Sequence, residues 1–315
     1  MMPRRVTIIG ASGFVGRYVV KRLAAEGAVI LACSRRAAAA GFLRPMGDVG
    51  QIAAINLDIA DERAVAAAVA GAEAVVNAVG ILFERGTQRF EEIHHQGPAR
   101  LARLAAAAGV RHFVHVSAIS ADASAPALYA RTKAAGEAAV RAAFPGAVIL
   151  RPSLVFGPED DFFNRFAAIA RYSPFLPLIG GGETKFQPVY VDDVAAAVAA
   201  VLAQPGAAEA YELAGPAVFS MKQLFEYMLQ VIGRRRLLVP VPFGLAAFQA
   251  FFLEFWPKPL LTRDQVRLLQ RDAVAVAGLP GLRELGIAPT VLESVLPSYL
   301  GRYRHPGTAY RARPA

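Results

Sequence analysis

The residues in this sequence best suited to chemistry are Tyr129 and Lys133, in the segment Tyr129-Ala130-Arg131-Thr132-Lys133. Side chains four residues apart lie on one face of a helix. A nearby ammonium lowers the pKa of a phenol and can also hold a ribose. Tyr129 and Lys133 are therefore the candidate catalytic residues, and both are expected to contact a nucleotide.

A glycine-rich turn near the start of the chain predicts where that nucleotide binds. An apolar strand over residues 6–9 runs into Gly10-Ala11-Ser12-Gly13-Phe14-Val15-Gly16, and an amphipathic helix follows. Glycines allow a sharp turn, and the N–H groups at a helix N-terminus can approach a pyrophosphate. An ordinary glycine-rich turn is the alternative. The residues predicted to contact a dinucleotide here are Gly10, Ser12, Gly13, Phe14, Val15 and Gly16.

The end of the second predicted strand indicates which dinucleotide is preferred. An acid at this position binds the ribose 2′-OH of NAD, whereas an arginine accommodates a 2′-phosphate. The sequence here is Ser34-Arg35-Arg36, without an acid. Arg35 can pair bidentately with a phosphate, and Ser34 can donate a further hydrogen bond. These residues favour NADP(H) over NAD(H), although the two arginines could also simply end a surface loop.

The ends of later strands supply the other predicted contacts. The Asp58 carboxylate could accept a hydrogen bond from an adenine amino group, with Asp61 free to cap the next helix. Small residues after the fourth strand would let the middle of the cofactor approach the backbone. The remaining predicted contacts are Asp58, Ile59, Ala78, Val79, Gly80, Ser117 and Pro152.

Alternating strand-like and helix-like runs predict an α/β fold. Helices on both faces of a doubly wound, Rossmann-type parallel sheet are expected, with a smaller C-terminal α/β portion. Residues 1–150 would form the nucleotide domain, residues 151–300 a region interleaved with it, and residues 301–315 a mobile basic tail. The predicted strands cover 5–9, 28–33, 51–56, 73–78, 112–117 and 147–150, and the predicted helices cover 14–26, 61–70, 89–108 and 128–143.

The composition of the 315 residues narrows the classes of function. Hydrophobic residues make up 55% and charged residues 19%, which allows a large core. The net charge is +9, but the basic residues are dispersed and no nucleic-acid motif occurs, so nucleic acid is not an expected partner. The single cysteine, Cys33, excludes an internal disulfide. The five histidines lack metal-ligand spacing, so we expect no metal site and no function for them.

Taken together, these motifs resemble the short-chain dehydrogenase/reductase superfamily in its extended, epimerase-like form. Later segments match as well: RPSLVFGP at 151–158, and VDDVA at 191–195, where Asp192 or Asp193 is expected to cap a helix. One position departs from the superfamily pattern. Its catalytic hydroxyl follows the fifth strand, where this chain reads Val-Ser-Ala and has Ala118. Ser117 should point to the wrong face, and Ser120 could substitute only if its loop folds back.

A narrower resemblance rests on residues 129–164, on QPVYVDDV at 187–194 and on TRDQV at 262–266. Over about residues 4–300 the chain is similar to the NAD(P)H-binding accessory subunit of respiratory complex I, the alpha-subcomplex subunit nine family. The resemblance implies a nucleotide held structurally, with peripheral-arm and membrane-interface subunits as partners. Because no targeting sequence precedes the first strand, we expect a bacterial cytoplasmic form at the cytoplasmic face of the inner membrane.

Residues 243–256 form a strongly apolar segment in which Gln249 and Glu254 are the only polar side chains. The segment is too short to span a bilayer. It must be buried against its own domain, docked on a partner, or placed at a membrane interface. Arginines 234–236 upstream and Lys258 downstream would suit anionic headgroups, so residues 234–258 are a candidate lipid contact.

Three functions remain open from the sequence. The first is a non-catalytic NADP(H)-binding subunit or assembly factor of complex I. The second is an active NADP-dependent reductase or epimerase acting on a hydrophobic substrate such as a quinone, sterol or isoprenoid, with Tyr129 as its acid–base group. The third is a sensor that binds NADP(H) weakly and reversibly.

Overall fold

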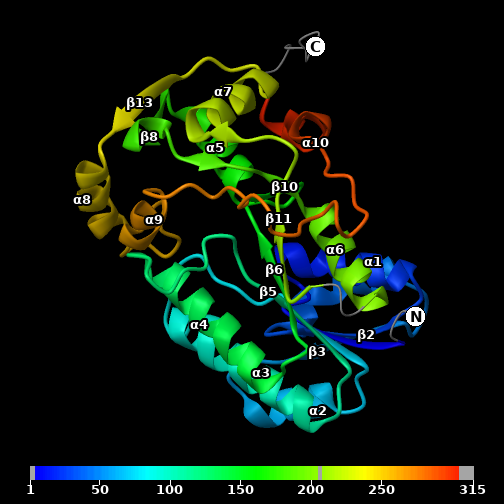
Figure 1. Cartoon of the computed structure of the whole chain (residues 1–315). Helices are drawn as coiled ribbons and strands as arrows, with labels where there is room; N and C mark the ends of the chain where they lie inside the picture. Colours follow the sequence, from blue (N-terminus) through cyan, green and yellow to red (C-terminus); the bar gives the residue numbers. More distant parts are fainter. Residues whose placement is uncertain (1–3, 205–207, 305–315) are drawn as a thin grey trace. The chain divides into compact units, whose positions relative to one another are not determined.

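The computed structural model describes residues 4–204 and 208–304, and the chain divides into two compact units (Figure 1). Unit 1 comprises Met1–Pro152, Val191–Leu213 and Val276–Ala288. Unit 2 comprises Ser153–Tyr190, Ala214–Ala275 and Pro289–Ala315. The chain therefore returns to unit 1 twice after residue 152.

Unit 1 is built on a seven-stranded parallel sheet in the order β11-β6-β5-β4-β1-β2-β3. This order confirms the predicted Rossmann-type fold, in which β1 and β4 flank the point where the strand order reverses. Most strands read as continuous apolar runs because both faces of the sheet are covered. The strands are β1 (Arg5–Ile9), β2 (Val29–Ser34), β3 (Ile52–Asn56), β4 (Ala74–Asn77), β5 (His112–Val116), β6 (Val148–Pro152) and β11 (Ala210–Leu213).

Helices cover both faces of this sheet. α1 (Phe14–Ala25) packs on α6 (Val191–Ala203) on one face, while α2 (Glu62–Val69), α3 (Gly97–Ala107) and α4 (Leu128–Ala143) line the other (Figure 1). Asp61 caps α2 by accepting a hydrogen bond from the Ala64 N–H, as predicted. The expected cap on α6 is wrong. The helix already begins at Val191, so Asp192 lies in its first turn and pairs with Arg22 at 2.9 Å.

The helix predicted over residues 89–108 is interrupted. Glu91–Gln96 form a π-helical turn, and α3 begins only at Gly97. Pro98 has no N–H to offer the carbonyl of His94, its helical partner four residues earlier. The Gly97 N–H bonds instead to the Glu92 carbonyl, five residues back, and this widens the turn.

Unit 2 contains short paired strands and helices around its own apolar core. Its strand pairs are β7 (Val155–Phe156) with β10 (Val189–Tyr190), β8 (Phe175–Ile179) with β13 (Leu237–Val241), and β9 (Lys185–Phe186) with β12 (Phe219–Ser220). Its helices are α5 (Phe162–Tyr172), α7 (Met221–Val231), α8 (Phe243–Leu253), α9 (Arg263–Leu268) and α10 (Leu292–Leu300). Phe156, Phe163, Leu224, Phe225 and Leu296 are fully buried in this core.

The predicted mobile tail is corrected at its start. Gly301–Tyr303 form a 3-10 turn, and the guanidinium groups of Arg302 and Arg304 donate hydrogen bonds to the backbone of unit 2. Residues 305–315 lie outside the described part of the chain.

Candidate functional site

The glycine turn connects β1 to α1. It therefore lies at the point where the strand order of the unit 1 sheet reverses, between β1 and β4. Gly10 has φ +84°, and a Cβ there would lie 2.9 Å from the backbone of Ala78, the residue directly after β4. A Cβ on Gly16 would lie 2.2 Å from the Gly10 carbonyl oxygen. The Gly13 N–H closes the turn by donating to that same carbonyl at 2.9 Å. The turn is therefore compact enough only for glycine at positions 10 and 16.

The N-terminus of α1 opens directly from this turn. Helix α1 begins at Phe14, and no side chain caps its N-cap residue Gly13, so its first N–H groups are available to an anion. The guanidinium of Arg17 donates to the carbonyls of Ser12 and Gly13, which brings a cation to the turn. Ser12, Phe14 and Val15 are partly exposed here. This geometry suits a pyrophosphate.

The end of β2 carries the residues predicted to select the cofactor. The Ser34 hydroxyl is buried and has no hydrogen-bond partner among the described residues. Arg35 and Arg36 are exposed beside it. A buried hydroxyl without a partner is costly, and a ligand oxygen would satisfy it. In the loop after β3, the Asp58 carboxylate accepts a hydrogen bond from the Ala60 N–H at 3.1 Å, and Ile59 is buried.

The loop after β4 is held against the sheet by hydrogen bonds. The Ala78 N–H donates to the Ile9 carbonyl, and the Val79 N–H donates to Asn77 Oδ1. A Cβ on Gly80 would lie 3.5 Å from Lys133 Nζ. The structure thus brings the predicted residues 78–80 together with both the glycine turn and Lys133.

Lys133 is almost fully buried, and its Nζ donates to the Val116 carbonyl at 3.3 Å. Burial lowers the pKa of Lys133 to about 8, an effect that the Glu137 carboxylate partly opposes. Glu137 is itself held by three hydrogen bonds from the Arg151 guanidinium. An ammonium carries three N–H donors, and the Val116 carbonyl accepts from one of them, so a ribose hydroxyl could be a further acceptor.

The predicted lowering of the Tyr129 pKa is wrong. Burial raises the pKa of this phenol to about 12. The reason is that its ring packs edge-on against Phe90 and His94, at 5.9 and 5.1 Å between ring centroids, and desolvation outweighs any effect of the lysine. Tyr129 is therefore a neutral hydrogen-bonding group rather than a ready base.

Three positions after β5 bear on the expected catalytic hydroxyl: Ser117, Ala118 and Ser120. Ala118 follows Ser117 directly after β5 and is buried. The Ser117 hydroxyl is buried without a hydrogen-bond partner among the described residues, so it does not bond to the Tyr129 phenol. Ser120 lies in the turn that follows. Pro152 is buried, and its carbonyl accepts from the Ile119 N–H.

Sequence reasoning missed a set of buried polar residues beneath the site. Asn77 Nδ2 donates to His115 Nδ1 at 3.1 Å, and His94 contacts both the Ile81 N–H and Thr132. Burial lowers the pKa values of His94 and His115 to about 2 and about 3, so both imidazoles are neutral. No motif marks these histidines: His115 stands in a largely apolar run, but His94 lies in the polar stretch Glu91–Gln96 and gives no sequence signal.

These observations define the class of the protein. Residues 6–214 match the model of the NAD dependent epimerase/dehydratase family, and the chain belongs to that family. The fold agrees: a dTDP-glucose 4,6-dehydratase from Streptomyces venezuelae, solved with NAD bound, superposes with a TM-score of 0.73 at 22% identity, covering 95% of this chain and 96% of that one.

Within that class the similarity is more specific. The chain is 36% identical over 314 residues to NADH dehydrogenase [ubiquinone] 1 alpha subcomplex subunit 9, mitochondrial, of Arabidopsis thaliana, covering 96% of this chain and 78% of that protein. It is 35% identical over 311 residues to the protein of the same name from Rattus norvegicus, covering 95% of this chain and 80% of that protein. The chain is therefore a homologue of complex I alpha subcomplex subunit 9.

Proposed function

We propose that this protein is an accessory subunit or assembly factor of respiratory complex I that holds NADP(H) as a structural element. The observation that carries the proposal is the pairing of a complete dinucleotide cradle with an incomplete proton-transfer site. The cradle consists of the glycine turn, the open α1 N-terminus and buried Lys133. The proton-transfer site lacks a hydroxyl at Ala118, and the buried Ser117 hydroxyl does not bond to the Tyr129 phenol.

The first experiment identifies the bound nucleotide. The protein is purified gently, dialysed and denatured, and the released nucleotide is identified and counted. Close to one NADP(H) per chain that survives dialysis and is not oxidised by quinones supports a structural cofactor. A chain that emerges empty contradicts tight structural binding and favours a sensor or an exchanging enzyme.

The preference for NADP(H) over NAD(H) rests on Ser34, Arg35 and Arg36. A charge-assisted hydrogen bond to a phosphate contributes about 1.5–3 kcal/mol. The Arg35→Ala substitution should weaken NADPH binding by roughly ten- to a hundredfold and leave NADH binding nearly unchanged. The matched control is Arg44→Ala, which removes an arginine ten residues from the end of β2. Equal losses for NADPH and NADH would contradict the assignment.

An active reductase on a hydrophobic substrate is the second candidate, favoured by the retained Tyr129 and Lys133. It predicts steady NADPH oxidation in a screen of quinones, sterols and isoprenoids, and loss of that turnover in Tyr129→Phe. The accessory-subunit proposal predicts no turnover in either protein, together with unchanged nucleotide binding in Tyr129→Phe.

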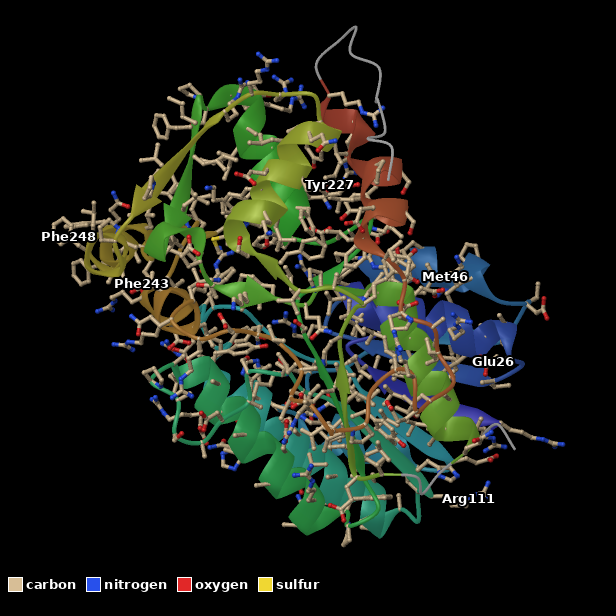
Figure 2. The ribbon with its side chains drawn as sticks, turned by 45° about the horizontal axis from the view of Figure 1, so that its top comes forward. Glu26, Met46, Arg111, Tyr227, Phe243 and Phe248 are labelled. Carbon is tan, nitrogen blue, oxygen red and sulfur yellow. The ribbon has the colours of Figure 1, made fainter. Side chains whose placement is uncertain are left out.

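Unit 2 offers the surface through which such a subunit would meet a membrane. Within α8 only Ala246 and Ala250 are buried. Phe243 packs on Gly180, whereas Phe248 points away from the rest of unit 2 (Figure 2). The large exposed side chains along and just after α8, which we call the α8 face, are Leu245 (50%), Phe248 (65%), Phe251 (43%), Phe252 (58%), Phe255 (78%) and Trp256 (71%).

Charge around the α8 face suits an anionic bilayer. Residues 234–258 contain four basic residues and one acid, Glu254, whose charge Arg263 neutralises at 2.9 Å. Aromatic side chains beside lysine and arginine are typical of a helix lying in the headgroup region. No helix in the described ranges, 4–204 and 208–304, is long and apolar enough to cross a membrane. We infer peripheral contact with anionic lipid through residues 234–258.

The partners and location follow from these points as parts of the same proposal. We expect association with peripheral-arm and membrane-interface subunits of complex I, on the cytoplasmic face of the inner membrane. Native purification should recover the protein with complex I subunits from the membrane fraction, and high salt should weaken its lipid contact. Recovery only in fractions free of membranes and complex I would contradict the proposal.

A further inference from the structure

The buried side chain of His94 connects two segments of the nucleotide site that are far apart in the sequence. Its Nε2 lies 3.2 Å from the N–H of Ile81, directly after the loop 78–80. Its Nδ1 lies 3.3 Å from Thr132 Oγ1, on the turn of α4 that carries Tyr129 and Lys133. The side chain is 1% exposed.

The hydrogen-bond geometry fixes which nitrogen carries the proton. The Ile81 N–H can only donate, so His94 Nε2 must be the acceptor. The single proton of the Thr132 hydroxyl is directed to the carbonyls of Leu128 and Tyr129, which lie 2.9 and 3.1 Å away, so its lone pairs are left to accept from His94 Nδ1. A neutral imidazole protonated at Nδ1 satisfies every group, whereas an imidazolium would place an N–H against the Ile81 N–H.

Packing around the ring holds it in this position. The imidazole stacks on Phe90 at 5.2 Å between ring centroids and meets the Tyr129 ring edge-on. Its backbone sits in the π-helical turn and presses on α4, where a Cβ on Gly136 would lie 1.8 Å from the His94 carbonyl oxygen. The imidazole therefore has no room to rotate away from its two partners.

We infer that His94 is the positioning residue of the nucleotide site, a neutral bridge that fixes the loop 78–81 against the Tyr129–Lys133 turn before a nucleotide binds. The inference rests on the proposed function, since the loop and the turn are the segments assigned to the cofactor. Fixing them in advance removes an entropic cost from binding. This is what a tightly retained structural cofactor requires.

Three substitutions separate bridging from packing. The amide of His94→Gln reaches the position of Nε2 and can accept from the Ile81 N–H. The shorter amide of His94→Asn can bond to Thr132 but cannot reach the Ile81 N–H. His94→Phe preserves the stacked ring but makes neither hydrogen bond. We expect NADPH dissociation constants to rise about tenfold in His94→Asn and His94→Phe but no more than about threefold in His94→Gln. A His94→Phe protein that binds NADPH like the wild type, or a His94→Gln protein as weak as His94→Phe, overturns the inference.

A second measurement on the nucleotide-free protein needs no binding partner. The Ile81 amide should exchange slowly with deuterium in the wild type and His94→Gln and faster in His94→Asn and His94→Phe. Nitrogen NMR of the wild type should show His94 as the neutral tautomer protonated at Nδ1. Rapid exchange at Ile81 in the wild type, or an imidazolium, overturns the inference. If the wild type binds no nucleotide while these signatures hold, the proposed function fails and the bridge stands.

Discussion

The cofactor end of unit 1 and the α8 face of unit 2 differ in the kind of side chain that each buries and exposes. Beneath the cofactor end, polar side chains are buried and paired, as in Asn77 with His115 and His94 with Thr132. On the α8 face, large aromatic side chains such as Phe248 and Trp256 are exposed to solvent. At the cofactor end, a few buried polar atoms lack a partner among the described residues, and the atoms of a small ligand could bond to them. The α8 face leaves an exposed apolar area that a larger surface would bury.

This difference teaches what each region can bind. A few buried groups without a partner among the described residues, such as the Ser34 and Ser117 hydroxyls, could be satisfied by the polar atoms of a small molecule. A contiguous exposed apolar surface is typical of a protein or membrane interaction site. The two regions should therefore fail independently when mutated, and the following predictions test that independence.

The largest effect is expected from Gly16→Ala in unit 1. The added Cβ would lie 2.2 Å from the Gly10 carbonyl, so the turn must open. Overpacking of this kind costs about 1–3 kcal/mol. Displacing the turn amides should weaken NADPH binding by roughly a hundredfold. Isothermal titration and thermal unfolding measure both effects, and vesicle binding should be unchanged.

Gly41→Ala is the control for this substitution, because a Cβ at Gly41 would meet nothing within 4 Å. It should bind NADPH like the wild type. If Gly16→Ala also retains full affinity, the glycine turn is not the pyrophosphate site.

A smaller but complementary effect is expected from the double substitution Phe248→Ser and Phe252→Ser on the α8 face. Burying one such side chain contributes about 1.5–3 kcal/mol, so vesicle binding should fall at least about tenfold. The measurement is co-sedimentation with vesicles of mixed anionic and zwitterionic lipid, compared with purely zwitterionic vesicles. NADPH affinity and thermal stability should not change.

The control is Val49→Ser, which removes a fully exposed apolar side chain from unit 1. Vesicle binding should be unaffected by it. Wild-type protein that ignores anionic vesicles, or a double variant that still binds them fully, would show that the α8 face meets a protein partner instead.

Much of unit 1 could be predicted because its signals are local. Apolar runs gave the first six strands of the sheet, and the helix over 128–143 matches α4. The glycine turn, and the arginine at position 35 in place of an acid, are each visible in a short contiguous segment of the sequence. β11 was not predicted, since the four residues of Ala210–Leu213 are too few to show a strand pattern.

What could not be predicted depends on contacts between distant segments. The π-helical turn needs both Pro98 and the close approach of Gly136 from α4. The pKa of Tyr129 depends on how Phe90 and His94 bury its ring, whereas the sequence shows only that a lysine stands four residues away. Likewise the composition of α8 predicts an apolar helix but not which of its side chains are exposed.

The last prediction concerns the charge of Lys133, a buried cation that we propose meets the cofactor. Burial lowers its pKa to about 8 in the folded protein, from about 10.4 in an unfolded chain. Between these values the unfolded chain binds more protons, so the free energy of unfolding of the nucleotide-free protein should rise with pH, by up to about 1.4 kcal/mol per pH unit. NADPH binding should change in the opposite direction, because the ammonium loses a donor as pH rises above about 8. Thermal unfolding and NADPH titration across this range measure both slopes, and Lys133→Met should remove them. Parallel pH profiles for the wild type and Lys133→Met would show that another group titrates and that Lys133 does not donate to the nucleotide.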